Sequence, residues 1–129
     1  MAGRLTISTL NDDTGVLATQ NGMTGVAKSW VNFDGTGTVS IRGSFNVASI
    51  TKNATGDYTV NFTTAMPNAN YCWLGIAKNV DGAANFNYPS VGNRFTTVPA
   101  TTSIRVGTAF QQSATPNDMP YVYVAVFSS

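Results

Sequence analysis

The sequence contains no histidine and no glutamate, and its single cysteine is Cys72. Without histidine the chain cannot form a Ser–His–Asp or Cys–His catalytic arrangement of its own, and the commonest metal ligand is missing. A lone cysteine excludes an intrachain disulfide and a zinc site built from several thiolates. The only carboxylate side chains belong to six aspartates. These absences predict a protein that is not an enzyme and that has no cofactor and no dedicated metal site. An incidental ion held by oxygen atoms of residues 11–14 or 79–82 is the alternative.

Charge is also scarce, since charged residues make up 10% of the 129 residues and the net charge is +1. Such a balance offers no basic stripe for nucleic acid and no polybasic segment for a lipid surface. No apolar run approaches the roughly 18–20 residues that span a bilayer. Residues 1–10 lack the basic stretch and apolar core of a signal peptide. We therefore expect no nucleic-acid partner, no membrane insertion and no signal peptide.

Apolar and polar residues alternate with a period of two in several segments, which is the pattern of a β-strand with one buried face. Residues 58–63 and 104–110 show it most clearly, and residues 4–8 and 39–42 repeat it. Glycine and proline interrupt the chain often, and residues 44–55 carry no amphipathic helical stripe. The pattern predicts an all-β protein with essentially no helix and about nine or ten strands. An antiparallel sandwich or a jelly-roll-like barrel accommodates such strands.

Turn residues locate the connections between these strands. Asp34-Gly35, Gly56 and Asp81-Gly82 supply residues that tolerate positive φ where a chain reverses. The longest irregular segments are residues 79–94 and residues 111–120. Loops of this length on a compact scaffold are often functional. We expect residues 26–129 to form a single β domain, preceded by a lead, residues 1–25, that contains the first strands.

Two predicted strands, residues 71–76 and residues 121–127, are apolar on both faces. One face of an antiparallel strand usually meets water, so these strands need a second burial partner. Either long loops of the same chain or a neighbouring subunit would cover them. Cys72 lies in the first of these strands and is expected to be a small buried hydrophobe. If a subunit covers them, the predicted interface residues are Trp30, Trp73, Tyr121, Tyr123 and Phe127.

The segment that contains Trp30 resembles a pattern found in bacteriophage tail-fibre and tail-tip proteins. Residues 27–42 read AKSWVNFDGTGTVSIR, and the likeness continues through residues 44–51, 56–63 and 65–67. It covers roughly residues 26–75, and the closing Tyr-Val-Tyr-Val strand is more weakly similar. A Trp-Val-Asn-Phe strand, a Gly-Thr-Gly turn and a Gly-Asp-Tyr-Thr-Val-Asn-Phe strand seldom coincide at this spacing.

The resemblance implies a fold and a function beyond what the pattern of residues predicts. Residues 26–129 would be the β-rich tip domain of a fibre, with residues 1–25 on the attachment side. Such a domain is typically a homotrimer, is made in the host cytoplasm and is carried on the virion by other tail or fibre proteins. It would bind a receptor on the host surface, either a glycan or a protein.

Aspartates occur in patterns known from enzymes, but their contexts do not suit catalysis. Asp13-Thr14-Gly15 is the aspartic-protease triplet, yet it follows polar residues, and the adjacent Asp12 belongs in water. A glycosidase needs two carboxyl groups roughly 5–9.5 Å apart, one of them with a raised pKa. We expect Asp34, Asp57 and Asp81 to be solvated, because they stand in turns or at a strand entrance. A small polysaccharide depolymerase is therefore the least favoured function.

Residues suited to recognition gather in the two long irregular segments. Aromatic faces stack on sugars, and amide groups both donate and accept hydrogen bonds. The alternative is that Phe86 and Tyr88 fold back as a lid over the core. A free-standing lectin-like carbohydrate-binding module remains the rival to a fibre tip. The predicted receptor-binding residues are Asn85, Phe86, Asn87, Tyr88, Asn93, Arg94, Gln111, Gln112 and Asn117.

Overall fold

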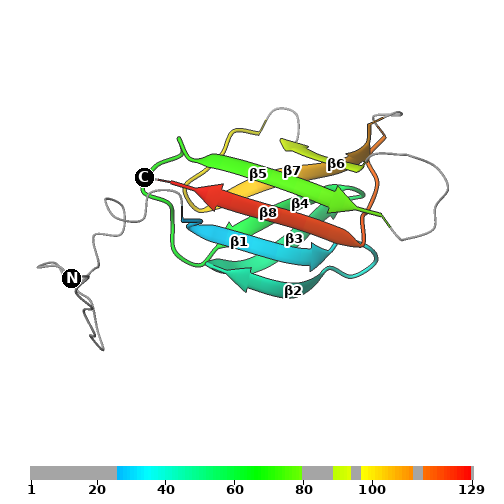
Figure 1. Cartoon of the computed structure of the whole chain (residues 1–129), viewed down its shortest axis with the longest axis horizontal. Helices are drawn as coiled ribbons and strands as arrows, with labels where there is room; N and C mark the ends of the chain where they lie inside the picture. Colours follow the sequence, from blue (N-terminus) through cyan, green and yellow to red (C-terminus); the bar gives the residue numbers. More distant parts are fainter. Residues whose placement is uncertain (1–25, 80–88, 94–96, 112–114, 129) are drawn as a thin grey trace, which may run out of the picture.

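The protein is a sandwich of two four-stranded antiparallel sheets (Figure 1). The computed structural model describes residues 26–79, 89–93, 97–111 and 115–128, which contain eight strands and no helix. The strands are β1 (Ser29–Asp34), β2 (Ser40–Phe45), β3 (Val47–Ala54), β4 (Asp57–Phe62), β5 (Cys72–Lys78), β6 (Pro89–Asn93), β7 (Ser103–Phe110) and β8 (Tyr121–Phe127). The prediction of an all-β sandwich is confirmed. The ninth and tenth strands and the jelly-roll winding stay predictions.

Sheet A has the strand order β2-β1-β8-β5, and sheet B has the order β3-β4-β7-β6. The chain passes from sheet A to sheet B at Asn46, which has a positive φ of 54°. The Asn46 carboxamide accepts a hydrogen bond from the Thr64 amide at 2.7 Å and donates to the Lys28 carbonyl at 3.1 Å. This single side chain therefore ties the corner to the segments before β1 and after β4.

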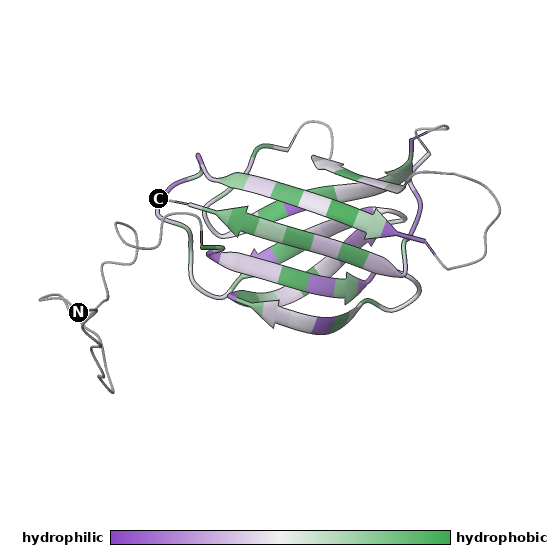
Figure 2. Ribbon diagram, in the orientation of Figure 1, coloured by the Kyte–Doolittle hydropathy of each residue, from purple (hydrophilic) through white to green (hydrophobic). Residues whose placement is uncertain are grey.

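The core lies between the sheets and is built from the alternating residues of the central strands (Figure 2). Phe33 of β1 and Tyr58 of β4 meet across the sandwich in an edge-to-face contact with ring centroids 5.2 Å apart. The period of two expected for residues 58–63 and 104–110 is confirmed, because every second residue from Tyr58 to Phe62 and from Ile104 to Thr108 is buried, and Phe110 is partly buried against the core. The largest fully buried side chains are Tyr58, Phe33, Ile104, Met119, Val31, Val60, Val106, Val122 and Val126.

One strand lies where an irregular segment was expected. Residues 79–94 include β6, which pairs with β7 and forms the edge of sheet B. Pro89 occupies the first position of this strand, where a missing amide proton is tolerated at a sheet edge. With a proline at its start and Gly92 within it, β6 carries too little alternation to be recognised from the sequence. In the described part of the chain, no helix is long and apolar enough to cross a membrane.

Candidate interaction surface on sheet A

The outer face of sheet B is polar and satisfies its own hydrogen bonds. The Asn61 amide donates to the Ser49 and Thr51 hydroxyls, both at 3.1 Å. Asp57 accepts two hydrogen bonds from the Arg105 guanidinium at 2.6 and 2.8 Å. A face of this kind is the water-facing side expected of an antiparallel sheet.

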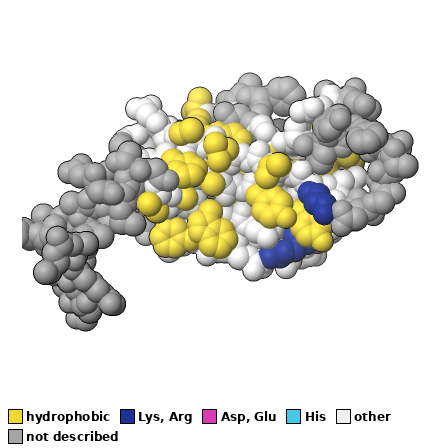
Figure 3. Space-filling view, viewed as in Figure 1, with side chains coloured by type: hydrophobic (Ala, Val, Ile, Leu, Met, Phe, Trp, Pro, Cys, Tyr) yellow, Lys and Arg dark blue, Asp and Glu magenta, His cyan; other side chains and the backbone are white. Residues whose placement is uncertain are grey.

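The outer face of sheet A is apolar instead. The strand register places two rows of side chains across all four strands, Phe45-Trp30-Ala125-Leu74 and Gly43-Asn32-Tyr123-Ile76. Figure 3 shows hydrophobic side chains gathered over these strands. Five large members of this face are exposed: Trp30 43%, Phe45 56%, Leu74 58%, Ile76 64% and Tyr123 36%.

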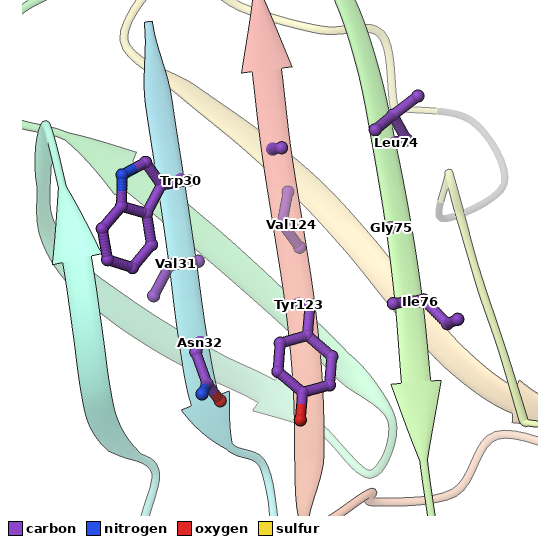
Figure 4. A pocket seen from close by; sticks show the side chains of 9 residues that line it. Trp30, Val31, Asn32, Leu74, Gly75, Ile76, Tyr123 and Val124 are labelled. Atoms are coloured by element: carbon purple, nitrogen blue, oxygen red, sulfur yellow. The ribbon is translucent and has the colours of Figure 1, made fainter. Parts of the chain in front are cut away.

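A shallow groove of about 440 Å³ runs along this face (Figure 4). Trp30 borders it on β1, while Leu74 and Ile76 border it on β5. The groove forms because Ala125, the residue between Trp30 and Leu74, has only a methyl group. Its walls are therefore almost entirely hydrocarbon and aromatic ring, which favours an apolar occupant over one with many hydroxyl groups.

Asn32 interrupts this apolar lining. It lies in the second row, between Gly43 of β2 and Tyr123 of β8. Its Oδ1 atom is buried and has no hydrogen-bond partner among the described residues. Leaving a buried acceptor unsatisfied costs about 1–3 kcal/mol. The Asn32 Oδ1 atom is therefore an unsatisfied acceptor that is already closed off from solvent within the chain.

Two cationic side chains, those of Arg42 and Lys78, form a polar rim at one end of the face. The Arg42 guanidinium lies 4.5 Å from the centroid of the Tyr121 ring, and the Lys78 ammonium lies 5.6 Å from it. An apolar centre with a charged edge is the usual organisation of a protein–protein interface.

The predicted interface residues do not all share this face. Trp30, Tyr121, Tyr123 and Phe127 lie on it, whereas Trp73 is partly buried and packs against the core. The expectation that Cys72 is buried was wrong, because Cys72 is exposed. In β5 the alternation turns Trp73 and Ala77 toward the interior, so Cys72 points outward with Leu74 and Ile76.

Most of the predicted receptor-binding residues lie outside the part of the chain that the structure describes. Six of them lie outside the described residues: Asn85, Phe86, Asn87, Tyr88, Arg94 and Gln112. Asn93 ends β6, and Gln111 is exposed directly after β7. The Asn117 backbone is tied to Thr108, whose carbonyl accepts a hydrogen bond from the Asn117 amide at 3.0 Å. The backbone of Asn117 is therefore fixed to β7.

The described carboxylates are each paired with a cation. Asp34 lies 3.0 Å from Arg42, and Asp118 lies 2.6 Å from Lys52. Asp57 was expected to be solvated, but it is only 2% exposed, because Arg105 covers and neutralises it. In the described part of the chain, no cluster of three or more acidic or cysteine side chains is arranged to hold a metal ion.

The pKa shifts of these groups run opposite to those of a glycosidase acid. Hydrogen bonds from Thr36 lower the pKa of Asp34 below its ordinary value. Burial opposes ionisation of Asp118, yet hydrogen bonds from the Gly56 amide, Lys52 and Tyr58 outweigh it and lower the pKa of that carboxyl. A general acid for glycoside cleavage needs a raised pKa. The lowered pKa values keep Asp34 and Asp118 ionised near neutral pH.

Comparison of the chain with protein-family models, with curated proteins and with solved structures finds no match. The outer face of sheet A, with its exposed apolar side chains and groove, is thus the candidate functional surface of the described residues.

Proposed function

We propose that this chain is a non-catalytic structural protein of a virion, a tail-fibre tip domain that assembles as a homotrimer and binds a glycan receptor on the host surface. The observation that carries the proposal is the exposed apolar face of sheet A. The resemblance of residues 26–75 to fibre proteins supports the choice of this kind of assembly.

The size of the apolar face supports its role as an interface. Taking roughly 200 Å² for a large side chain, its five exposed members present on the order of 500 Å² of apolar surface. A standard interface buries about 800 Å² per partner, of which about 60% is apolar, or roughly 480 Å². One chain therefore carries about the apolar area that a stable interface between copies requires.

The other surfaces of the sandwich are poorly suited to association. The free edge strands β2 and β3 both contain register shifts, and such bulges discourage edge-to-edge pairing. On the opposite side, β5 and β6 pack against each other, with Val91 in close contact with Gly75. The outer face of sheet B is polar and internally bonded. Among these surfaces, the outer face of sheet A is therefore the one whose burial would remove the most apolar area from water.

The directions of the strands are compatible with a tip domain that attaches to the fibre at one end and binds its receptor at the other. The chain enters β1 where Ser29 pairs with Val126. The connections after β5 and before β8 leave from the other end, where Lys78 pairs with Tyr121 (Figure 1). Three chains turned toward a common axis would present all these connections together, and three weak sites on one rigid body raise avidity without new contacts.

A lectin-like monomer is the second candidate, favoured by the exposed rings of Trp30 and Tyr123, which offer flat surfaces to a sugar. Light scattering combined with glycan-array binding by the wild-type chain separates the two. A fibre tip predicts that the wild type binds the array as a trimer. A wild-type chain that is a monomer and still binds the array would contradict the fibre-tip proposal and favour the lectin.

A further inference from the structure

The apolar face of sheet A carries a projecting ring and a hollow in the same row of side chains. That row runs Phe45-Trp30-Ala125-Leu74 across the four strands. Phe45 lies on the edge strand β2, is 56% exposed and does not line the groove. Ala125 lines the groove, and its methyl group leaves a hollow between the two larger side chains on either side of it. The ring and the hollow are therefore level with each other along the strands.

Trp30 does not fill this hollow, because its ring leans toward β2. A Cβ atom at Gly43 would lie 3.5 Å from the Cη2 and Cζ3 atoms of Trp30, so the indole rests over this glycine. Figure 4 shows the Trp30 ring on the side of β1 that faces β2. Leu74 and Ile76 border the groove from β5. The described side chains of one copy thus leave the hollow above Ala125 open.

We infer that the Phe45 ring of one copy of this chain occupies the hollow above Ala125 of the next copy. The inference rests on the assembly in the proposed function and names the residues that meet in it. Aromatic side chains that fill a pocket on the partner are typical anchors of protein interfaces. The walls of the hollow are apolar, so a phenylalanine ring suits them better than a sugar, whose hydroxyl groups would lose hydrogen bonds to water.

The shared row fits an assembly whose axis runs along the strands. Rotation about such an axis leaves the height of each row unchanged, so Phe45 of each copy is level with Ala125 of the next. The contact joins two different parts of the surface, so each copy gives a ring to one neighbour and receives a ring from the other. Contacts of this heterologous kind close into a cycle when the rotation between copies divides a full turn. Three copies then make three identical contacts.

The test exchanges the sizes of the two residues. Phe45→Ala removes the ring and Ala125→Phe fills the hollow, so each variant alone should weaken association at least about tenfold. The double variant Phe45→Ala/Ala125→Phe sets a new ring opposite the vacated space and should recover association to within about threefold of the wild type. Val98→Ala shortens an exposed side chain in the connection before β7 and is the matched control, expected to associate as the wild type. Sedimentation velocity over a concentration series measures association, and circular dichroism confirms folding.

A disulfide gives a second test that does not depend on the larger side chain fitting its strand. Phe45 and Ala125 lie two strands apart within one chain, about 10 Å. This separation is too long for a disulfide within the chain. Phe45→Cys combined with Ala125→Cys and Cys72→Ser should therefore oxidise only between copies and give a covalent species of three times 13.6 kDa on a non-reducing gel. An assembled chain that gives no cross-linked species overturns the inference.

The outcomes separate this inference from the proposed function. A monomeric wild type overturns both. A wild-type trimer that Phe45→Ala and Ala125→Phe leave unchanged overturns only the inference, and so does a double variant that associates no better than the weaker single variant. An intact assembly in which Ala125→Phe loses glycan binding also overturns it and assigns the groove to a sugar.

Discussion

At the scale of single residues, the Asp118 carboxylate connects parts of the chain that are distant in sequence. It accepts hydrogen bonds from the Tyr58 hydroxyl at 2.6 Å and from the Gly56 amide at 2.8 Å. The Lys52 ammonium adds an ion pair and also reaches the Gly35 carbonyl at 3.2 Å. The segment before β8 is thereby held to β3, to β4 and to the turn after β1.

This network predicts a dependence of stability on pH. The pKa of Asp118 is lower in the folded chain, so its contribution is fully present above the unfolded pKa of about 3.9 and is lost as pH falls through the lowered folded value. Asp118→Asn should reduce the free energy of unfolding at neutral pH by about 2 kcal/mol, since charged hydrogen bonds are lost. Urea unfolding across this acidic range should then show a flatter profile for the variant than for the wild type.

Asp34→Asn is the matched control for this experiment. Its pKa is also lowered, but Asp34 ends β1 and bonds to Thr36 and Arg42 at the surface. Exposed pairs contribute about 0–1 kcal/mol. An Asp118→Asn variant with the neutral-pH stability and acid profile of Asp34→Asn would show that the network does not stabilise the fold.

At the scale of elements, Gly56 in the β3–β4 turn packs closely against the rest of the sandwich, whereas Gly37 in the β1–β2 connection does not. Gly56 and Gly37 both have positive φ, 61° and 55°. A Cβ atom at Gly56 would lie 2.5 Å from the Thr108 carbonyl oxygen and 2.6 Å from the Asn117 amide nitrogen. At Gly37 a Cβ would meet nothing within 4 Å. The same backbone conformation therefore has very different surroundings.

We predict different losses of stability on substituting alanine at these two glycines. Gly37→Ala should cost about 1–2 kcal/mol, which is the left-handed backbone penalty alone. Gly56→Ala should cost at least about 3 kcal/mol, because backbone atoms on two segments must also move. Chemical denaturation measures both values. Equal losses in the free energy of unfolding would mean that the close packing around Gly56 does not contribute to stability.

Sequence reasoning found the strands in which the alternation of residues along the strand itself shows which side chains are buried. Strands β4 and β7 show clean alternation because each has one core face and one polar face. Strand β6 was missed because an edge strand needs little alternation. The outward position of Cys72 was also missed, since an apolar run does not reveal which of its faces the core covers.

The sequence could not predict that the Asn32 Oδ1 atom is buried without a hydrogen-bond partner among the described residues. Its surroundings come from β2, β5 and β8, and the register between these strands is set by the whole sheet. The sequence did predict Trp30 as an interface residue, and its side chain is exposed on the outer face of sheet A because its neighbour Val31 faces inward. A sequence shows which residues of one strand alternate between its two faces. It does not show which residues of the neighbouring strands lie beside them.

At the scale of the whole molecule, the sandwich has one polar and one apolar outer face. The polar face carries internal hydrogen bonds between neighbouring strands, and the apolar face exposes Trp30, Leu74 and Ile76. Covering apolar surface is worth roughly 25 cal/mol per Å² before the costs of association. The account therefore requires that the apolar face is buried between copies.

Light scattering on a concentration series of the wild type, Ile76→Lys and Thr51→Lys tests this requirement most directly. Ile76 is exposed on sheet A and Thr51 is exposed on sheet B, so each variant adds one charge to one outer face. The account predicts three times 13.6 kDa for the wild type and Thr51→Lys, and 13.6 kDa for Ile76→Lys. A wild type of 13.6 kDa at every concentration, or an Ile76→Lys variant that assembles like the wild type, would contradict it.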